Sequence, residues 1–325
     1  MTDPTLENRF VGTIVGVAVG DALGAPFEGV DANRLFQESE QMDFAPVLGF
    51  PRGQYTDDTQ MTLAIIKAIL KDGAVDGKTV ADEFAELWRS GEILGAGASC
   101  SEGVWRYIRG EAEWDKCGTE RGRAGNGTAM RASPIGLWDY DAPDRIARDA
   151  EVISIMTHSD ERAVAGAIAV ASAVAYLVTA QEVSPADFAE RVSGNVRERS
   201  EEFARALDKL PELLRADERD AIPAIINEGW TGHDPSFGVT PFVIPTVLAS
   251  SYAFLKYPHD FSSSVRAVIN MGGDVDSTGS ITGAMSGAFN GVGAIPRHLR
   301  EGVKDSREIH DLAAALFDKK TQFSR

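Results

Sequence analysis

Cysteine and basic residues are both scarce in this chain of 325 residues. The two cysteines, Cys100 and Cys117, cannot build a disulfide framework and fit a reducing compartment, so we expect a cytoplasmic protein. The 32 Lys and Arg residues are outnumbered by 49 Asp and Glu residues, which gives a formal net charge of -17. Because that charge repels a nucleic-acid backbone and an anionic membrane surface, neither is expected as a partner.

A membrane-spanning run near the N-terminus is missing as well. The apolar N-terminal stretch at residues 10–20 follows acidic residues rather than a basic region and stops at Asp21. It is too short to cross a bilayer and lacks the charge pattern of a signal peptide, so no membrane span is expected. With 43% hydrophobic residues the chain can bury a large core, and no linker or repeat divides it. We therefore expect one domain over residues 1–325.

Strand-like alternation is scarce, whereas helical periodicity extends along most of the chain. Apolar residues at i, i+3, i+4, i+7 and i+8 form one stripe that starts at Met61 and ends at Ile69. Thr79 and Asp82 fit a capping box, and Ser184-Pro185 fits the start of a helix. The alanine-rich stretch at 163–180 carries no charge and predicts a buried helix. These patterns predict an all-α fold.

Glycine recurs at every fourth position in two segments, at residues 16, 20 and 24 and at residues 279, 283 and 287. Glycine inside a helix costs stability unless another backbone approaches closely. The two segments therefore predict central, tightly packed helices.

Two adjacent carboxylates, Asp57 and Asp58, follow Thr56 directly before a helix that we expect to begin near Gln60. Hard oxygen ligands of this kind suit a divalent cation. The structural alternative is a helix cap, since Asp and Thr are ordinary N-caps and acids favour the positive end of a helix.

A second acidic segment, Gly272-Gly273-Asp274-Val275-Asp276-Ser277, leads into the second glycine-spaced helix. Its alternating acids and hydroxyl place oxygen ligands on one side of a turn, as Mg²⁺, Mn²⁺ or Ca²⁺ require. An EF-hand is excluded because its twelfth position is Met285 rather than Glu. An aspartyl phosphatase also fits the spacing, but no βαβ pattern follows to form its sheet. A helix cap with a solvated carboxylate is the structural alternative.

Two further acids, Asp21 and Glu28, flank the end of the first glycine-spaced segment. The more common role of a lone acid beside glycine is to satisfy neighbouring backbone groups, and we expect this role for Asp21. Glu28, taken by itself, indicates no particular structural or functional role.

Taken together, these segments resemble the ADP-ribosylglycohydrolase family, including the dinitrogenase-reductase-activating glycohydrolases of bacteria. The matching motifs, in chain order, are GDALGAPFE at 20–28, YTDDTQM at 55–61, GNGTAMR at 125–131, TH at 157–158 and GGDVDS at 272–277. The resemblance implies a single compact multi-helix domain with a central dinuclear metal site. It also implies hydrolysis of the bond between ADP-ribose and a modified protein side chain, with ADP-ribosyl-arginine as the expected linkage.

By this resemblance, two divalent cations, Mg²⁺ or Mn²⁺, would be bound by the side chains of Thr56, Asp57, Asp58, Asp274, Asp276 and Ser277. Cations are needed on physical grounds too, because two carboxylates about 4 Å apart repel by about 4 kcal/mol at an effective dielectric constant near 20. Asp58 or Glu28 would act as the base that activates water.

The resemblance further implies that Asn126, Gly127, Met130 and His158 bind ADP-ribose, whose diphosphate would lie on the glycine-rich segment at 122–130. Arg123 is an addition that the family does not share. The structural alternatives are a flexible surface loop and a histidine that caps a helix.

One departure from the family affects the substrate. Many arginine-directed relatives carry an Asp-x-Gly-x-Thr segment where this chain reads Gly95-Ala-Gly-Ala-Ser99. An acid there could pair with a guanidinium group through two hydrogen bonds. Its absence keeps three alternatives open: ester-linked (serine-linked or O-acyl) ADP-ribose, a free ADP-ribosyl or ribosyl metabolite, and a nucleoside analogue. A non-catalytic relative that binds ADP-ribose is a separate alternative, although such a relative would be expected to lose some of the acids that this chain retains.

Overall fold

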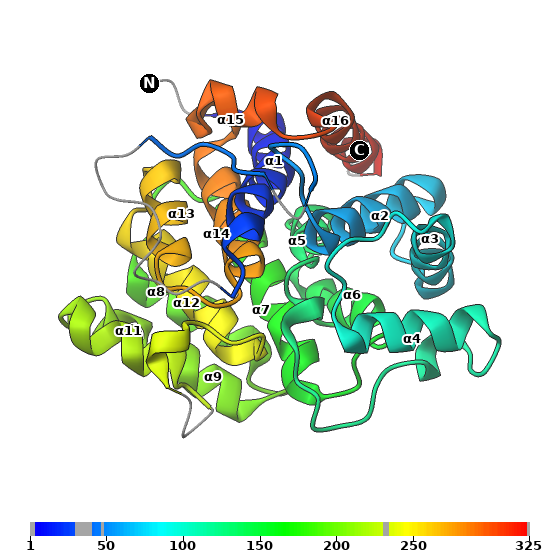
Figure 1. Ribbon diagram of the computed structural model, residues 1–325, viewed down its shortest axis with the longest axis horizontal. Helices are drawn as coiled ribbons and strands as arrows, with labels where there is room; N and C mark the ends of the chain where they lie inside the picture. Colours follow the sequence, from blue (N-terminus) through cyan, green and yellow to red (C-terminus); the bar gives the residue numbers. More distant parts are fainter. Residues whose placement is uncertain (1–3, 30–40, 47–48, 230–233, 324–325) are drawn as a thin grey trace.

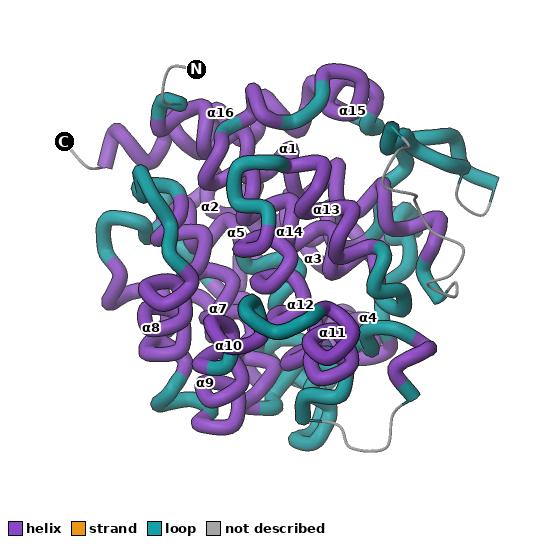
Figure 2. Tube along the Cα trace, turned by 90° about the vertical axis from the view of Figure 1, so that its left-hand side faces the viewer, coloured by secondary structure: helices purple, strands orange, loops and turns teal. Residues whose placement is uncertain are grey.

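α-Helices make up the long ordered elements of the protein. The computed structural model describes residues 4–29, 41–46, 49–229 and 234–323, and strand-like pairing between these residues takes the form of isolated bridges such as that of Thr119 with His158. Figure 2 accordingly shows helices and loops and no strand among the described residues. The predicted all-α class is confirmed.

The α-helices of the first half of the chain are α1 (Leu6–Gly24), α2 (Asp57–Asp72), α3 (Gly77–Ser90), α4 (Ala98–Ile108), α5 (Ser133–Trp138), α6 (Ile146–Ser154) and α7 (Glu161–Leu177). Those of the second half are α8 (Pro185–Val196), α9 (Glu201–Asp208), α10 (Leu210–Leu213), α11 (Glu218–Ile226), α12 (Val243–Lys256), α13 (Phe261–Ile269), α14 (Val275–Asn290), α15 (Arg297–Gly302) and α16 (Ser306–Phe323).

Helices α1 and α14 lie side by side at the centre, although they come from opposite ends of the chain (Figure 1). Their backbones touch along the predicted glycine positions. A Cβ atom added to Gly16 would lie 2.1 Å from the carbonyl oxygen of Gly283, and one added to Gly20 would lie 2.0 Å from that of Gly279. The glycines are therefore required by the contact, as the spacing predicts.

A single cluster of buried apolar side chains surrounds this pair and extends from Phe10 to Leu316. The predicted alanine-rich helix is α7, which is almost fully buried and ends at Leu177 rather than at Ala180. Ser184 caps α8 as predicted, since its hydroxyl accepts the N–H of Asp187.

Two predicted helix starts are wrong by a few residues. Helix α3 is capped by Asp76, whose carboxylate accepts the N–H of Thr79, so Thr79 lies inside the helix and not at its cap. Helix α2 begins at Asp57 and not near Gln60, because α1 supplies the groups that cap it. Both acids of the first cluster therefore lie in the first turn of α2.

The N-terminal apolar helix is longer than its sequence suggests. Counted with the short 3-10 turn η1 (Ala25–Phe27), it spans the 22 residues Leu6–Phe27, which is enough to cross a membrane by length and composition. Its most apolar window is 89% buried inside the fold, however, as in the core helix of a globular protein.

Candidate active site and metal centre

Asp21 of α1 fixes the first turn of α2. Its fully buried carboxylate accepts the backbone N–H groups of Thr56 and Thr59 at 3.0 Å and the hydroxyl groups of the same residues at 2.8 and 2.6 Å. An acid from another helix thus caps α2, which is the backbone-satisfying role expected for Asp21. The cap holds Asp57 and Asp58 at the end of α1 that faces the site.

Two backbone hydrogen bonds to Val239 position the second acidic segment. The N–H of Val239 donates to the carbonyl of Gly272 at 2.9 Å, and the N–H of Asp274 donates back to the carbonyl of Val239 at 2.8 Å. Gly273 has φ +85°, and a Cβ there would lie 2.1 Å from the Val239 carbonyl oxygen, so only glycine fits. These two hydrogen bonds hold Asp274 and Asp276 in place at the start of α14.

Glu28 joins these two acids in space. Ligand oxygens of Glu28, Asp274 and Asp276 all lie within 4.8 Å of one another. The N–H of Gly29 donates to the carbonyl of Gly273 at 2.9 Å and so ties Glu28 to the same loop. Glu28 is exposed, whereas Asp274 and Asp276 are buried. Three carboxylates at this spacing form a set of hard oxygen donors that fits a divalent cation.

Asp58 and Ser277 extend this set from α2 and α14. The Ser277 hydroxyl lies 3.4 Å from Oδ2 of Asp58, a residue that is 1% exposed. Oδ1 of Asp58 is buried without a hydrogen-bond partner among the described residues. A buried carboxylate oxygen without a donor is costly, and a cation would compensate it.

Burial raises the pKa of several acids in the site. The pKa of Asp57 rises to about 8, first because its carboxyl group is desolvated and second because the charge of Asp21 repels its ionised form. The pKa of Asp58 and of Asp276 is raised by the same two kinds of cause, burial first and neighbouring carboxylates second. The folded chain therefore favours protonated acids unless positive charge is supplied.

These shifts predict how metal and pH act together on stability. A carboxyl group whose pKa rises from 3.8 to about 8 on folding favours the folded state below pH 4 and loses that contribution as the pH rises through 8. Cations bind the ionised form, so Mg²⁺ or Mn²⁺ should raise Tm by roughly 5 °C at saturating concentration near pH 8 and by clearly less at pH 5. Thermal unfolding with metal or EDTA at several pH values tests this. An equal gain at every pH would contradict it.

A glycine-rich segment forms the opposite wall. Asn126 begins the 3-10 turn η4 (Asn126–Thr128), and its amide donates to Asp274 at 2.7 Å and lies 3.1 Å from the Thr246 hydroxyl. His158 stands behind this segment: a Cβ added to Gly125 would lie 3.1 Å from its Nε2 atom, and one added to Gly127 would lie 3.0 Å from its Cε1 atom. From Ala124 to Met130 the segment is buried or half-buried and is held by tertiary contacts, so this part of it is not a surface loop.

The acids and the glycine-rich wall enclose one cavity of about 220 Å³. Its lining consists of Glu28, Asp57, Asp58, Gly95, Gly97, Ala98, Ser99, Cys100, Gly125, Asn126, Gly127, Met130, His158, Pro241, Asp274, Asp276 and Ser277. All predicted site residues except Thr56 are among them. The hydroxyl of Thr56 instead donates to Asp21 at 2.8 Å.

Comparison with known proteins points to the same chemistry. The sequence model of the ADP-ribosylglycohydrolase family matches residues 2–324. The chain belongs to the ADP-ribosylglycohydrolase family. The resemblance seen in the motifs is thereby confirmed, and a hydrolase acting on ADP-ribosyl groups is supported at the level of the family.

Two relatives that align over most of this chain have names that state what they act on. The ADP-ribosyl-[dinitrogen reductase] glycohydrolase of Rhodospirillum rubrum is 28% identical over 322 residues, which cover 97% of this chain and 98% of that protein. ADP-ribosylarginine hydrolase Tri1 of Serratia proteamaculans is 24% identical over 314 residues, which cover 94% of this chain and 78% of that protein. A solved structure described as an ADP-ribosylglycohydrolase-related protein complex has a TM-score of 0.70 at 27% identity and covers 97% of this chain and 99% of its own.

Sequence reasoning missed two residues that line the cavity of this ADP-ribosylglycohydrolase. Cys100 lies at the first turn of α4 and Pro241 precedes α12, and neither belongs to a motif that carries chemistry. Cys100 could have been found as the continuation of the Gly95–Ser99 segment. Nothing in the sequence signals Pro241, whose carbonyl accepts the N–H of Asn126 at 3.0 Å.

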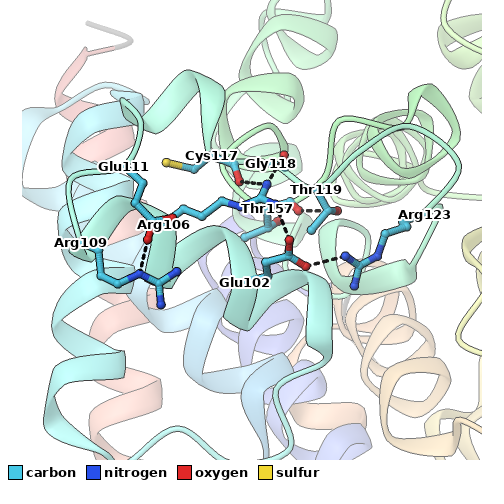
Figure 3. A network of polar contacts seen from close by, with 9 residues as sticks. All are labelled: Glu102, Arg106, Arg109, Glu111, Cys117, Gly118, Thr119, Arg123 and Thr157. Atoms are coloured by element: carbon cyan, nitrogen blue, oxygen red, sulfur yellow. Dashed lines mark hydrogen bonds and ion pairs between the residues drawn. The ribbon is translucent and has the colours of Figure 1, made fainter.

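Arg123, a candidate diphosphate ligand, pairs with Glu102 and lies outside the cavity lining. Figure 3 shows Glu102 of α4 between Arg106 and Arg123. The guanidinium group of Arg123 donates to Glu102 at 2.5 Å, and Arg123 does not line the cavity. Arg106 also donates to the carbonyls of Cys117 and Gly118, so the network fastens α4 to the segment before the glycine-rich wall.

Proposed function

We propose that this chain hydrolyses the glycosidic bond between ADP-ribose and a modified protein side chain, with ADP-ribosyl-arginine as its first substrate and two divalent cations, Mg²⁺ or Mn²⁺, as cofactors. The observation that carries the proposal is the convergence of Glu28, Asp274 and Asp276 on one cavity, with the buried Asp58 beside them. A family of ADP-ribosylglycohydrolases supplies the substrate class.

The residues present fit two cations. Asp57, Asp58, Asp274, Asp276 and Ser277 offer oxygen donors on the cavity wall, and Thr56 would contribute only through the lone pairs that its bond to Asp21 leaves free. Bound cations supply the charge that lowers the pKa of a water molecule and orients ribose hydroxyl groups. Asp57, Asp58 and Asp276 need this charge in particular, since burial raises the pKa of each of them and disfavours its ionised form.

Glu28 is the better of the two candidate bases. It is exposed to the cavity, and its pKa is raised by burial first and by Asp274 second, which makes it a stronger base than a free carboxylate. Asp58 is almost fully buried, which suits a metal ligand. In the reaction the carboxylate of Glu28 takes one proton from water as the water oxygen bonds to the anomeric carbon. The bond from that carbon to the side-chain nitrogen or oxygen breaks with its electron pair on the leaving atom, which takes up a proton from solvent, and Glu28 returns its own proton to solvent.

Two observations bear on the linkage that is cleaved. The name of the Serratia relative favours arginine. The cavity wall formed by Gly95, Gly97, Ala98 and Ser99 carries no acid that could pair with a guanidinium group, which favours a neutral leaving group such as the serine hydroxyl. Serine-linked, O-acyl and free ADP-ribosyl compounds are therefore the second candidates.

Release of ADP-ribose from arginine-linked and serine-linked peptides tests both the reaction and the linkage. We expect release that needs Mg²⁺ or Mn²⁺, stops with chelator, and falls at least about 100-fold in Asp276→Ala, because loss of outer-shell partners alone costs 10–100-fold. Glu308→Ala, which removes an exposed carboxylate on α16, is the matched control. Binding of ADP-ribose and metal without release from any substrate would establish a non-catalytic binding protein instead.

A further inference from the structure

Gln60, in the first turn of α2, makes two side-chain hydrogen bonds that leave its own helix. Its Nε2 atom donates to the carbonyl of Glu92 at 2.7 Å, and its Oε1 atom accepts the N–H of Leu94 at 2.9 Å. The two partners fix the orientation of the side-chain amide, because a carbonyl only accepts and an N–H only donates. The amide therefore binds the loop as a neighbouring backbone peptide group would.

The loop at residues 92–97, between α3 and α4, is held mainly from this turn. Among the residues that the structure describes, three hydrogen bonds join the loop to an element other than its two flanking helices. Two are those of Gln60, and the third runs from the N–H of Asp57 to the carbonyl of Leu94 at 2.8 Å. Asp57 and Gln60 are three residues apart and share one face of α2. The turn that carries the acids therefore also holds the loop.

The loop continues directly into the cavity wall at residues 95–99. Gly95 has φ +80°, and a Cβ there would lie 3.1 Å from Oδ1 of Asp57, so the backbone passes close beside this carboxylate. Gly97 lines the cavity, and a Cβ added there meets nothing within 4 Å. The separation between wall and acids is thus set where the loop is bound, at residues 92–94, and not by packing at Gly97.

The 95–99 wall is one of three parts of the cavity lining, beside the acids and the glycine-rich segment. In the proposed reaction the ribose lies at the acids, and the rest of ADP-ribose lies along the glycine-rich segment. This division leaves the 95–99 wall to face the side chain that is released.

We infer that Gln60 is a positioning residue for the leaving group: by binding residues 92 and 94 it fixes the distance between the 95–99 wall and the Asp57 carboxylate. The inference rests on the proposed function for the identity of the substrate. Gln60 does not line the cavity, so it acts through the loop and not by contact with the substrate. A small shift of the wall is enough, since a misplacement of about 1 Å can slow an enzymatic step about 100-fold.

Gln60→Met tests this role. Methionine keeps the length and the helix propensity of glutamine but makes neither hydrogen bond. Asn290→Leu is the matched control, because Asn290 is also half-buried and its amide ties α14 to the carbonyl of Pro258 at 2.7 Å, outside the cavity lining. We expect kcat/KM on an ADP-ribosylated peptide to fall about tenfold or more in Gln60→Met, as for two lost hydrogen bonds, and to stay within about twofold in the control.

Binding of ADP-ribose and of Mn²⁺ separates the positioning of the leaving group from general damage to the site. ADP-ribose lacks the leaving group, so its Kd by calorimetry, and that of Mn²⁺ by electron paramagnetic resonance, should stay within about twofold of the wild type in Gln60→Met. Equal losses in hydrolysis and in the binding of either ligand would overturn the inference. So would unchanged hydrolysis.

Hydrogen exchange measures the anchor itself, without a substrate. In Gln60→Met the amides of residues 92–97 should exchange about tenfold faster, and those of residues 125–130 and 272–277 should not change. Unchanged exchange at 92–97 would overturn the inference. So would a freely exchanging Leu94 amide in the wild type, a result that decides the matter even if the variant does not fold. A wild type that cleaves no ADP-ribosyl peptide would refute the proposed function and with it the leaving-group role, whereas faster exchange confined to 92–97 would still establish the anchor.

Discussion

Asp58→Asn is expected to abolish hydrolysis without unfolding the protein. Its Oδ1 atom is buried and has no hydrogen-bond partner among the residues that the structure describes, and its Oδ2 atom contacts Ser277 across the interface between α2 and α14. An amide keeps the shape of the side chain but removes the charge that would balance a cation. Release of ADP-ribose should therefore fall at least about 100-fold, since the change removes a ligand rather than an outer-shell partner.

The stability of the same variant separates this effect from damage to the fold. Because burial raises the pKa of Asp58, removing its charge should leave metal-free protein at pH 8 as stable as the wild type or more stable. Asp139→Asn is the matched control: Asp139 is also fully buried, and burial and Asp149 raise its pKa to about 8, but it does not line the cavity. The control should gain stability at pH 8 and keep its activity. Activity of Asp58→Asn within tenfold of the wild type would refute the role.

The second large effect is expected at the seam between α1 and α14. In Gly16→Ala the new methyl group would lie 2.1 Å from the Gly283 carbonyl oxygen, and neither backbone can move without separating the helices. Overpacking commonly costs 1–3 kcal/mol, and a clash with backbone rather than a flexible side chain should cost more than about 3 kcal/mol. Urea unfolding in EDTA, followed by circular dichroism, measures the change.

Gly194 provides the matched control for this substitution. It lies inside α8, and a Cβ added there meets nothing within 4 Å. Gly194→Ala should therefore raise the free energy of unfolding by about 0.5–1 kcal/mol, the difference in helix propensity between the two residues. If Gly16→Ala lowered stability by less than 1 kcal/mol, the two backbones would not be in the close contact described for the seam.

The sequence predicts the helical class and the glycine seam well because both patterns are local and repeat along the chain. Residues 16, 20 and 24 recur at the period of a helix, and only another backbone can explain their cost. The start of α2 is less accessible from the sequence, since its cap comes from Asp21, 35 residues earlier. The cytoplasmic location and the single domain over residues 1–325 stay predictions.

In the candidate site too, local motifs can be predicted from the sequence, whereas contacts between distant residues cannot. The acids and the glycine-rich segment stand out as motifs, whereas the alignment of Asn126 with Asp274 depends on a contact across 148 residues. The assignment of Thr56 as a ligand followed the motif and could not show that Asp21 takes its hydroxyl hydrogen. Arg123 likewise pairs with Glu102, and nothing in the local sequence indicates this partner.

The placement of α1 against α14 also sets the order in which the site can form. The hydroxyl of Ser277 meets the carboxylate of Asp58 across 219 residues of chain, and the glycine-rich wall lies between them in sequence. Contacts this distant form late and slowly, because the chain must first close a long loop. During synthesis the helices from α2 to α13 leave the ribosome before the acids of α14 exist. The acids of the site can therefore come together only after α14 has been made, and a nascent chain that stalls before α14 lacks the helix that covers the glycine face of α1.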